Sequence, residues 1–206
     1  MSARLWRQIG ELTLEHVVLV AIAVLLAAAI ALPAGVLATR RPAFRRISLA
    51  LANVMQTIPS LALFGLLSPL PLIGGIGKNT AVIALVLYAL LPMLRNTLVG
   101  ITSIDAAVRE SAIALGMTPG QVLFQVEIPL AARTILAGIR LATVTTIGTA
   151  TIAAAIGAGG LGVFLYRGIA SVDAHQILAG AVPAALLAVL ADGGLGWVEK
   201  RFTVAD

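Results

Sequence analysis

The sequence predicts an all-α membrane protein because it is strongly apolar, carries few charges and contains five apolar runs long enough to cross a bilayer. Of its 206 residues, 60% are apolar and 11% are charged, and the mean hydropathy is +1.04. A typical soluble domain is about 45–50% apolar and about 25% charged. The apolar surface of this chain therefore exceeds what a soluble monomer could cover, and lipid must be the solvent for much of it.

Five transmembrane helices are predicted, since about 20 apolar residues are needed to span the hydrocarbon core as a helix. They cover residues 17–38, 47–67, 80–98, 134–156 and 177–197. The second run contains Pro59, which is expected to break its helix because proline lacks a backbone N–H and clashes with the preceding turn. Together the runs form a transmembrane domain over residues 17–206.

The first sixteen residues are predicted to form a separate helix in the membrane interface. Leu5, Trp6, Ile9 and Leu12 recur at helical spacing with polar residues between them, a pattern typical of an interfacial helix. A disordered leader is the alternative interpretation of residues 1–16.

The basic residues predict that the N-terminus lies outside the cell and the C-terminus in the cytoplasm. Residues 40–46 carry four arginines, and by the positive-inside rule such a segment stays in the cytoplasm. With five spans, four of the 14 lysines and arginines (Arg4, Arg7, Lys78 and Arg167) then fall outside, which leaves ten at cytoplasmic ends or loops. This bias favours the stated orientation.

Residues 100–133 form the one long cytoplasmic loop of this topology. The loop is charged, yet it keeps apolar residues at helical intervals: Ala106, Ala107, Ala112, Ile113, Leu115 and Val122. Gly116 and the pair Pro119-Gly120 are expected to interrupt it. The pattern predicts short helices on the cytoplasmic surface whose apolar side packs on a partner or, alternatively, on the chain's own surface.

Within this loop, Glu110-Ser111-Ala112 is followed after three residues by Gly116, and after nine more by Val126-Glu127-Ile128-Pro129. This motif resembles the EAA motif of the permease subunits of binding-protein-dependent ABC importers. The family pattern is Glu-Ala-Ala, three residues, glycine, nine residues and Ile-x-Leu-Pro, and every spacing matches here. Three positions depart from it by small or aliphatic exchanges. The resemblance implies that the motif couples the chain to a cytoplasmic ATP-hydrolysing subunit through Glu110, Ser111, Ala112, Gly116, Val126, Ile128 and Pro129.

Longer segments resemble the osmoprotectant permeases of this family, which carry glycine betaine, carnitine or choline. These segments are residues 56–65, 84–92, 94–97, 148–151 and 156–162. The resemblance implies the fold of the methionine-importer permeases and a location in the bacterial inner membrane. The implied partners are a pair of ATPase subunits, a second identical or related permease and, because the chain has no fused substrate-binding domain, a separate extracytoplasmic binding protein. A permease for amino acids or methionine with the same fold is the alternative.

No catalytic residue, metal site or cofactor is predicted. The chain has no cysteine, which excludes thiolate ligands and nucleophiles, and no basic run interleaved with aromatic residues predicts nucleic-acid binding. Gly157-x-Gly159-x-x-Gly162 matches the dinucleotide fingerprint, but that motif acts only between a strand and a helix. Leu72 and Asn79 break the phosphate-loop pattern around Gly77-Lys78. ATP must therefore be hydrolysed by another chain.

A membrane enzyme and a passive channel are disfavoured for separate reasons. An enzyme would need clustered nucleophiles, carboxylates or histidines, and a channel would not need a docking loop. His16 and His175 are expected to be solvated or capping residues near the outer surface.

Polar residues within the spans predict the translocation path. The candidates are Asn53, Gln56, Thr57, Thr145 and Thr149. Polar side chains at this depth usually face the protein interior, although hydrogen bonding between helices is an alternative role for the threonines. We expect only a weak solute site here, because the aromatic residues that would hold a quaternary ammonium are few and scattered.

Overall fold

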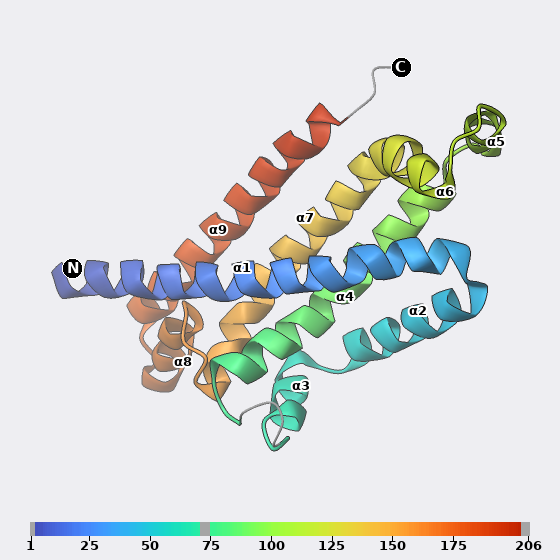
Figure 1. Ribbon diagram of the computed structural model, residues 1–206. Helices are drawn as coiled ribbons and strands as arrows, with labels where there is room; N and C mark the ends of the chain where they lie inside the picture. The colour runs from blue at the N-terminus through green and yellow to red at the C-terminus, as the bar shows by residue number, and fades with distance from the viewer. Residues whose placement is uncertain (1–2, 71–74, 203–206) are drawn as a thin grey trace.

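α1 (Ala3–Arg40) is one helix of 38 residues in the computed structural model, which describes residues 3–70 and 75–202. At 1.5 Å per residue its length is about 57 Å, nearly twice the hydrocarbon thickness of about 30 Å. The prediction of a separate interfacial helix over residues 1–16 is therefore wrong for residues 3–16, and residues 1–2 lie outside the described residues. α1 runs through the expected break without interruption (Figure 1). Near that point, Glu15 and His16 bind other elements of the bundle.

The remaining elements follow in chain order, and all of those in the described residues are helical. They are α2 (Pro42–Thr57), α3 (Ser60–Leu67), α4 (Lys78–Thr102), α5 (Ala106–Ala114), α6 (Pro119–Gln121), the π-helical segment η1 (Val122–Glu127), α7 (Ile128–Ile152), the 3₁₀ segment η2 (Ala153–Ile156), α8 (Gly162–Ser171) and α9 (Ala174–Arg201).

Four continuous helices are long and apolar enough to cross a membrane, which confirms four of the predicted spans. They are Arg4–Arg40, Lys78–Thr102, Pro119–Ile156 and Ala174–Arg201. The second predicted span is instead the pair α2 and α3, bent by 103° at Ile58-Pro59. Pro59 thus interrupts the helix as predicted, and the count is five only if this bent pair is one span.

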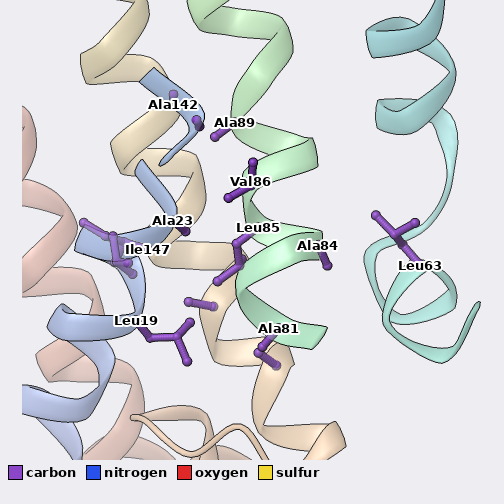
Figure 2. Packing of buried hydrophobic residues seen from close by; sticks show 14 of the residues in the cluster. Leu19, Ala23, Leu63, Ala81, Ala84, Leu85, Val86, Ala89, Ala142 and Ile147 are labelled. Carbon is purple, nitrogen blue, oxygen red and sulfur yellow. The ribbon is translucent and has the colours of Figure 1, made fainter. Parts of the chain in front are cut away.

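α4 lies at the centre of the bundle and packs between α1 and α7, while α9 packs on α7 and α8 packs on α9 (Figure 1). Small side chains make these contacts close: Ala23 on α1, Ala84 and Ala89 on α4 and Ala142 on α7 are all fully buried (Figure 2). Small residues let helix backbones approach in membrane proteins, where van der Waals packing drives association.

The bundle has two ends. The α5 end holds Arg40 of α1, Thr102 of α4, the start of α7 and the close of α9, together with α5 and α6 (Figure 1). The α8 end holds α8 and the start of α4. There Glu15 on α1 accepts from Lys78 Nζ at 2.6 Å and from the backbone N–H of Gly160 at 3.1 Å.

α8 is an element that the sequence did not predict. The chain turns tightly over residues 157–161, where Gly157, Gly159 and Gly160 all have positive φ, and this turn leads into α8. Asp173 then begins α9 by accepting from the backbone N–H of His175 at 2.9 Å. A hydrogen bond from the Gln176 side chain is the main cause that lowers the pKa of the Asp173 carboxyl.

The long loop predicted over residues 100–133 is shorter in the structure. α4 continues to Thr102, and residues 119–156 form one run of helix, so only residues 103–118 connect the two spans. Pro129 is tolerated inside this run because the wide π-helical turn η1 precedes it: Ile128 N–H bonds Leu123 O, five residues back. A π-helical turn of this kind interrupts the regular i to i−4 hydrogen bonds of an α-helix, and such interruptions accommodate residues that do not fit a regular helix.

Candidate translocation groove and coupling segment

A groove of about 250 Å³, lined by both polar and apolar side chains, lies between α2, α4 and α7. Its lining residues are Gln56, Tyr88, Leu91, Pro92, Arg95, Asn96, Leu141, Thr145 and Thr149. Three of the five predicted path residues, Gln56, Thr145 and Thr149, are thus brought together from helices far apart in sequence. Gln56 and Thr145 are exposed on the flank of the bundle. Lipid tails offer no hydrogen bonds to polar side chains exposed in this way.

The other two predicted path residues, Asn53 and Thr57, are not among the residues that line the groove. Asn53 lies one turn before Gln56, and its Oδ1 accepts from Arg95 Nη2 at 3.3 Å, so it borders the groove through that arginine. Thr57 does not line the groove, and its hydroxyl donates to the carbonyl of Val54 at 2.8 Å. The helix ends at Thr57, which explains why its hydroxyl serves the last turn.

The groove threonines bond within their own helix. Thr145 Oγ1 donates to Leu141 O at 2.9 Å and Thr149 Oγ1 donates to Thr145 O at 2.9 Å. Neither forms the hydrogen bond between helices that was the alternative role. Their hydroxyl oxygens keep acceptor capacity toward the groove.

Sequence reasoning missed Tyr88, Arg95 and Asn96 as groove residues. They stand with Pro92 at positions i, i+4, i+7 and i+8 of α4, which places them on one helical face. This spacing in the sequence could have indicated that the three residues share a polar face of the helix. Among the described residues, Arg95 has no carboxylate within ion-pair distance and is exposed in the groove.

The bend between α2 and α3 is held against the groove by Tyr88. Its hydroxyl donates to the carbonyl of Ile58 at the break, and the side chain of Gln56 donates to the backbone carbonyl of Tyr88 at 2.9 Å. The break thus leaves one carbonyl, that of Ile58, bonded by a side chain in place of a helical N–H.

The predicted coupling segment begins with α5, which stands out from the α5 end of the bundle (Figure 1). Asp105 caps it, accepting from the N–H of Ala107 at 2.9 Å. Of the motif residues on α5, Glu110 and Ser111 are exposed and Ala112 is buried. The exposed apolar side chains Val108, Ile113 and Leu115 make a surface suited to a protein partner.

Gly116 ends α5 in the conformation that the motif's glycine requires. Its φ is +81°, its N–H bonds Ile113 O at 2.9 Å, and Met117 N–H bonds Ala112 O at 3.2 Å. These two bonds are a Schellman motif with glycine at the left-handed position. The remaining motif residues, Val126, Ile128 and Pro129, lie at the junction of η1 and α7.

Glu127, within the motif but not predicted as a site residue, joins these two parts. Its side chain is 0% exposed and binds Arg109 of α5 (Nε to Oε1, 2.7 Å) and Arg40 of α1. Sequence spacing gives no signal for this contact, because Arg40 is 87 residues away.

A second ion-pair site ties α7 to α9. Arg140 binds Asp192 through two bonds of 2.6 and 2.7 Å, and Glu199 lies 3.3 Å from Arg140 and 3.8 Å from Arg133. Charged side chains in spans usually pair in this way. Asp192, which lies in the fifth predicted span, is thus paired with an arginine of a neighbouring helix.

The two histidines differ from each other in their surroundings. His16 is 1% exposed and its Nε2 lies 3.1 Å from Ile147 O, so the prediction that it is solvated is wrong: α7 and the Gly160 turn cover it. His175 is exposed in the first turn of α9. In residues 3–70 and 75–202, no group of three or more His, Asp or Glu is placed to hold a metal ion.

Comparison with solved structures finds the same fold in importer permeases. A chain of the MetNI methionine ABC transporter in an inward-facing conformation superposes with a TM-score of 0.89 at 24% identity, over 99% of this chain and 100% of the other. A chain of an amino acid ABC transporter crystallised with histidines gives 0.80 at 18% identity, over 98% and 100%. The fold prediction is confirmed.

Curated relatives are more similar in sequence. The carnitine transport permease protein OpuCD of Listeria monocytogenes is 48% identical over 90% of this chain and 82% of the relative. The osmoprotectant import permease protein OsmW of Salmonella typhimurium is 46% identical over 95% and 90%, and the choline transport system permease protein OpuBB of Bacillus subtilis is 41% identical over 95% and 90%.

Residues 31–204 match the family described as binding-protein-dependent transport system inner membrane component. This match covers the groove, the coupling segment and all helices from the last part of α1 onward. The chain is therefore a multi-pass inner-membrane protein and belongs to the family of permease components of binding-protein-dependent ABC transporters.

Proposed function

We propose that this chain is the permease of an ATP-driven importer for osmoprotectants such as glycine betaine, carnitine or choline. The observation that carries the substrate class is the identity of 41–48% to permeases named for these solutes, over most of both chains. The alternative is a methionine or amino-acid permease. It is supported only by solved structures that are 24% and 18% identical to this chain, and a similarity at that level shows the fold alone.

The solute path is proposed to run along the groove between α2, α4 and α7. Gln56, Thr145, Thr149 and Arg95 offer donors and acceptors there, and Asn53 positions Arg95. Thr57 is no longer a candidate for contact with solute in this conformation. Water-mediated hydrogen bonds to its polar side chains would let the groove pass a small polar solute without a high-affinity binding site.

A second permease, either a copy of this chain or a relative, is proposed to cover the groove. Support comes from the exposure of polar Gln56, Arg95 and Thr145 on one flank of the bundle, where contact with lipid would leave the remaining hydrogen-bond donors of Gln56 and Arg95 unsatisfied. Two such flanks facing each other would enclose one path.

α5 is proposed to dock on one subunit of a cytoplasmic ATPase pair through Glu110, Ser111 and its exposed apolar residues. The α5 end then faces the cytoplasm, with the C-terminus, while the N-terminus and α8 face outside. The cluster of four arginines at residues 40–46 supports this orientation. The α8 end would receive a separate binding protein loaded with solute.

The experiment is uptake of radiolabelled glycine betaine, carnitine and choline into proteoliposomes that contain the chain with its ATPase and binding protein. We expect ATP-dependent uptake of at least one of them. Uptake of methionine or another amino acid in their place would overturn the substrate assignment and leave the importer function standing.

A coupling arm compares Gly116→Val with Gly116→Asn. A β-branched residue is strained at the positive φ of Gly116, whereas asparagine tolerates it. Strain of about 1–2 kcal/mol is expected to lower uptake by up to about tenfold in Gly116→Val only. Equal uptake by both variants would contradict the role given to this turn.

A further inference from the structure

Glu127 is a buried carboxylate at a point where four elements meet. Its Oε1 accepts from Arg109 Nε at 2.7 Å, its Oε2 accepts from Arg40 Nη2, and its side chain is 0% exposed. Arg109 Nη2 also donates to the carbonyl oxygen of Ile101 at 3.2 Å. These three side chains, called here the Glu127 junction, tie α5 to the ends of α1 and α4 and to the helix that becomes α7.

α5 has few other attachments to the bundle. Ala112 is its buried residue, while Val108, Glu110 and Ile113 are exposed. The chain on either side of α5 is a short turn: residues 103–105 before it and 115–118 after it. A force applied to the exposed side of α5 therefore reaches the spans through Ala112, the two turns and the Glu127 junction.

The π-helical turn contributes to the geometry of the junction. η1 ends at Glu127, and its wider turn changes the rotational register of the residues that follow, compared with a regular α-helix. This places the carboxylate between Arg40 and Arg109 while α7 continues beyond Pro129. The family motif assigns no role to this residue, since Glu127 occupies its unspecified position.

We propose that Glu127 is a positioning residue for energy coupling: through Arg109 and Arg40 it makes α1, α4 and α7 follow the movement of α5. The inference rests on the proposed function of α5 as the ATPase contact. The Glu127 carboxylate is fully buried, whereas the Arg109 and Arg40 side chains are 29% and 44% exposed. Charge-assisted bonds to a buried carboxylate resist separation more than ion pairs in which both partners are exposed. Loss of this contact is expected to uncouple ATP hydrolysis from transport.

The test uses the complete complex in proteoliposomes, in which ATP hydrolysis and glycine betaine uptake are measured together as ATP consumed per solute moved. Glu127→Gln keeps the shape of the side chain and removes its charge. We expect hydrolysis to stay within about twofold and the ATP consumed per solute to rise about tenfold, a typical size for coupling between sites. An unchanged ratio would overturn the proposal.

Glu199→Gln is the matched control. Glu199 is a carboxylate at the same end of the bundle, 17% exposed, and it also lies within ion-pair distance of two arginines, Arg133 and Arg140. It contacts α7 and not α5, so we expect its loss to lower thermal stability without changing the ATP consumed per solute. The same rise in this variant would show a general effect of lost ion pairs and would also overturn the proposal.

A second variant covers the case in which Glu127→Gln does not assemble. The chain has no cysteine, so Arg109→Cys/Glu127→Cys can be bridged with a cleavable bis-methanethiosulfonate reagent. We expect uncoupling before bridging, recovery on bridging and renewed uncoupling on reduction. If bridging does not change the ATP consumed per solute, or if neither variant assembles, the Glu127 junction is a purely stabilising contact and the proposal is overturned.

The same assay separates this inference from the proposed function. If the wild-type complex moves no osmoprotectant, the proposed function fails. If the wild type does move one and Glu127→Gln leaves the ratio unchanged, only the inference fails.

Discussion

At the scale of single residues, glycines decide how closely the central helices approach. A Cβ on Gly138 of α7 would lie 2.5 Å from Asn96 Cβ and 3.0 Å from Pro92 O on α4. Both neighbours line the groove wall. The absence of a side chain at this position therefore sets the distance between α4 and α7 where they line the groove.

We predict that Gly138→Ala destabilises the protein by about 1–3 kcal/mol, the usual cost of overpacking. Gly148→Ala is the control in the same helix, since a Cβ there meets nothing within 4 Å, and it is expected to stabilise by up to about 1 kcal/mol through helix propensity. Thermal unfolding of the purified permease in detergent measures both. Equal melting temperatures for the two variants would contradict the packing argument.

At the scale of elements, the broken helix α2–α3 depends on a contact from α4. Pro59 prevents a continuous helix, but the 103° bend also needs a partner for the carbonyl of Ile58, which Tyr88 supplies through its hydroxyl. An unsatisfied buried acceptor costs about 1–3 kcal/mol. The bend is therefore a tertiary feature as well as a consequence of proline.

Tyr88→Phe is predicted to loosen this bend and to lower stability by about 1–3 kcal/mol. A single cysteine at Ser60, introduced into the cysteine-free chain, should then react faster with a maleimide in membranes. Tyr166→Phe is the control, because Tyr166 is 40% exposed and none of the hydrogen bonds among the described residues involves its hydroxyl. Unchanged reactivity in Tyr88→Phe would mean that proline alone fixes the bend.

At the scale of the whole molecule, the flank that holds the groove exposes polar side chains, whereas part of α9 exposes large apolar ones. The polar flank is the groove wall with Gln56, Arg95 and Thr145, whereas α9 exposes Leu186, Val189 and Leu190. Lipid solvates the second kind of surface and not the first. The asymmetry supports two permeases that face each other across the groove.

Thr145→Cys is accordingly predicted to form a disulfide-linked or reagent-linked adduct with the partner permease in native membranes. The control Val189→Cys, 68% exposed on α9, should react with a lipid-soluble thiol reagent but not form the adduct. Adducts are read by gel electrophoresis without reductant. Linking through Val189 and not through Thr145 would place the interface on the other flank.

The sequence by itself determined the features that depend on local patterns. Apolar runs predicted four continuous spans, Pro59 predicted the break between α2 and α3, and Gly116 predicted the turn that ends α5. Each follows from composition or from spacing within one helix or turn, where period and backbone conformation are fixed by neighbouring residues. The resemblance to importer permeases was likewise carried by contiguous segments.

Tertiary structure decided what depends on residues far apart in the chain. Residues 3–16 are part of α1, against the prediction of a separate helix, and Glu15 and His16 there bind the Gly160 turn and α7. The groove needs α2, α4 and α7 side by side, and Glu127 finds Arg40 across 87 residues. A helix's own sequence fixes which face is polar, but only packing fixes which polar faces meet, because the partners of a buried charge are set by the fold.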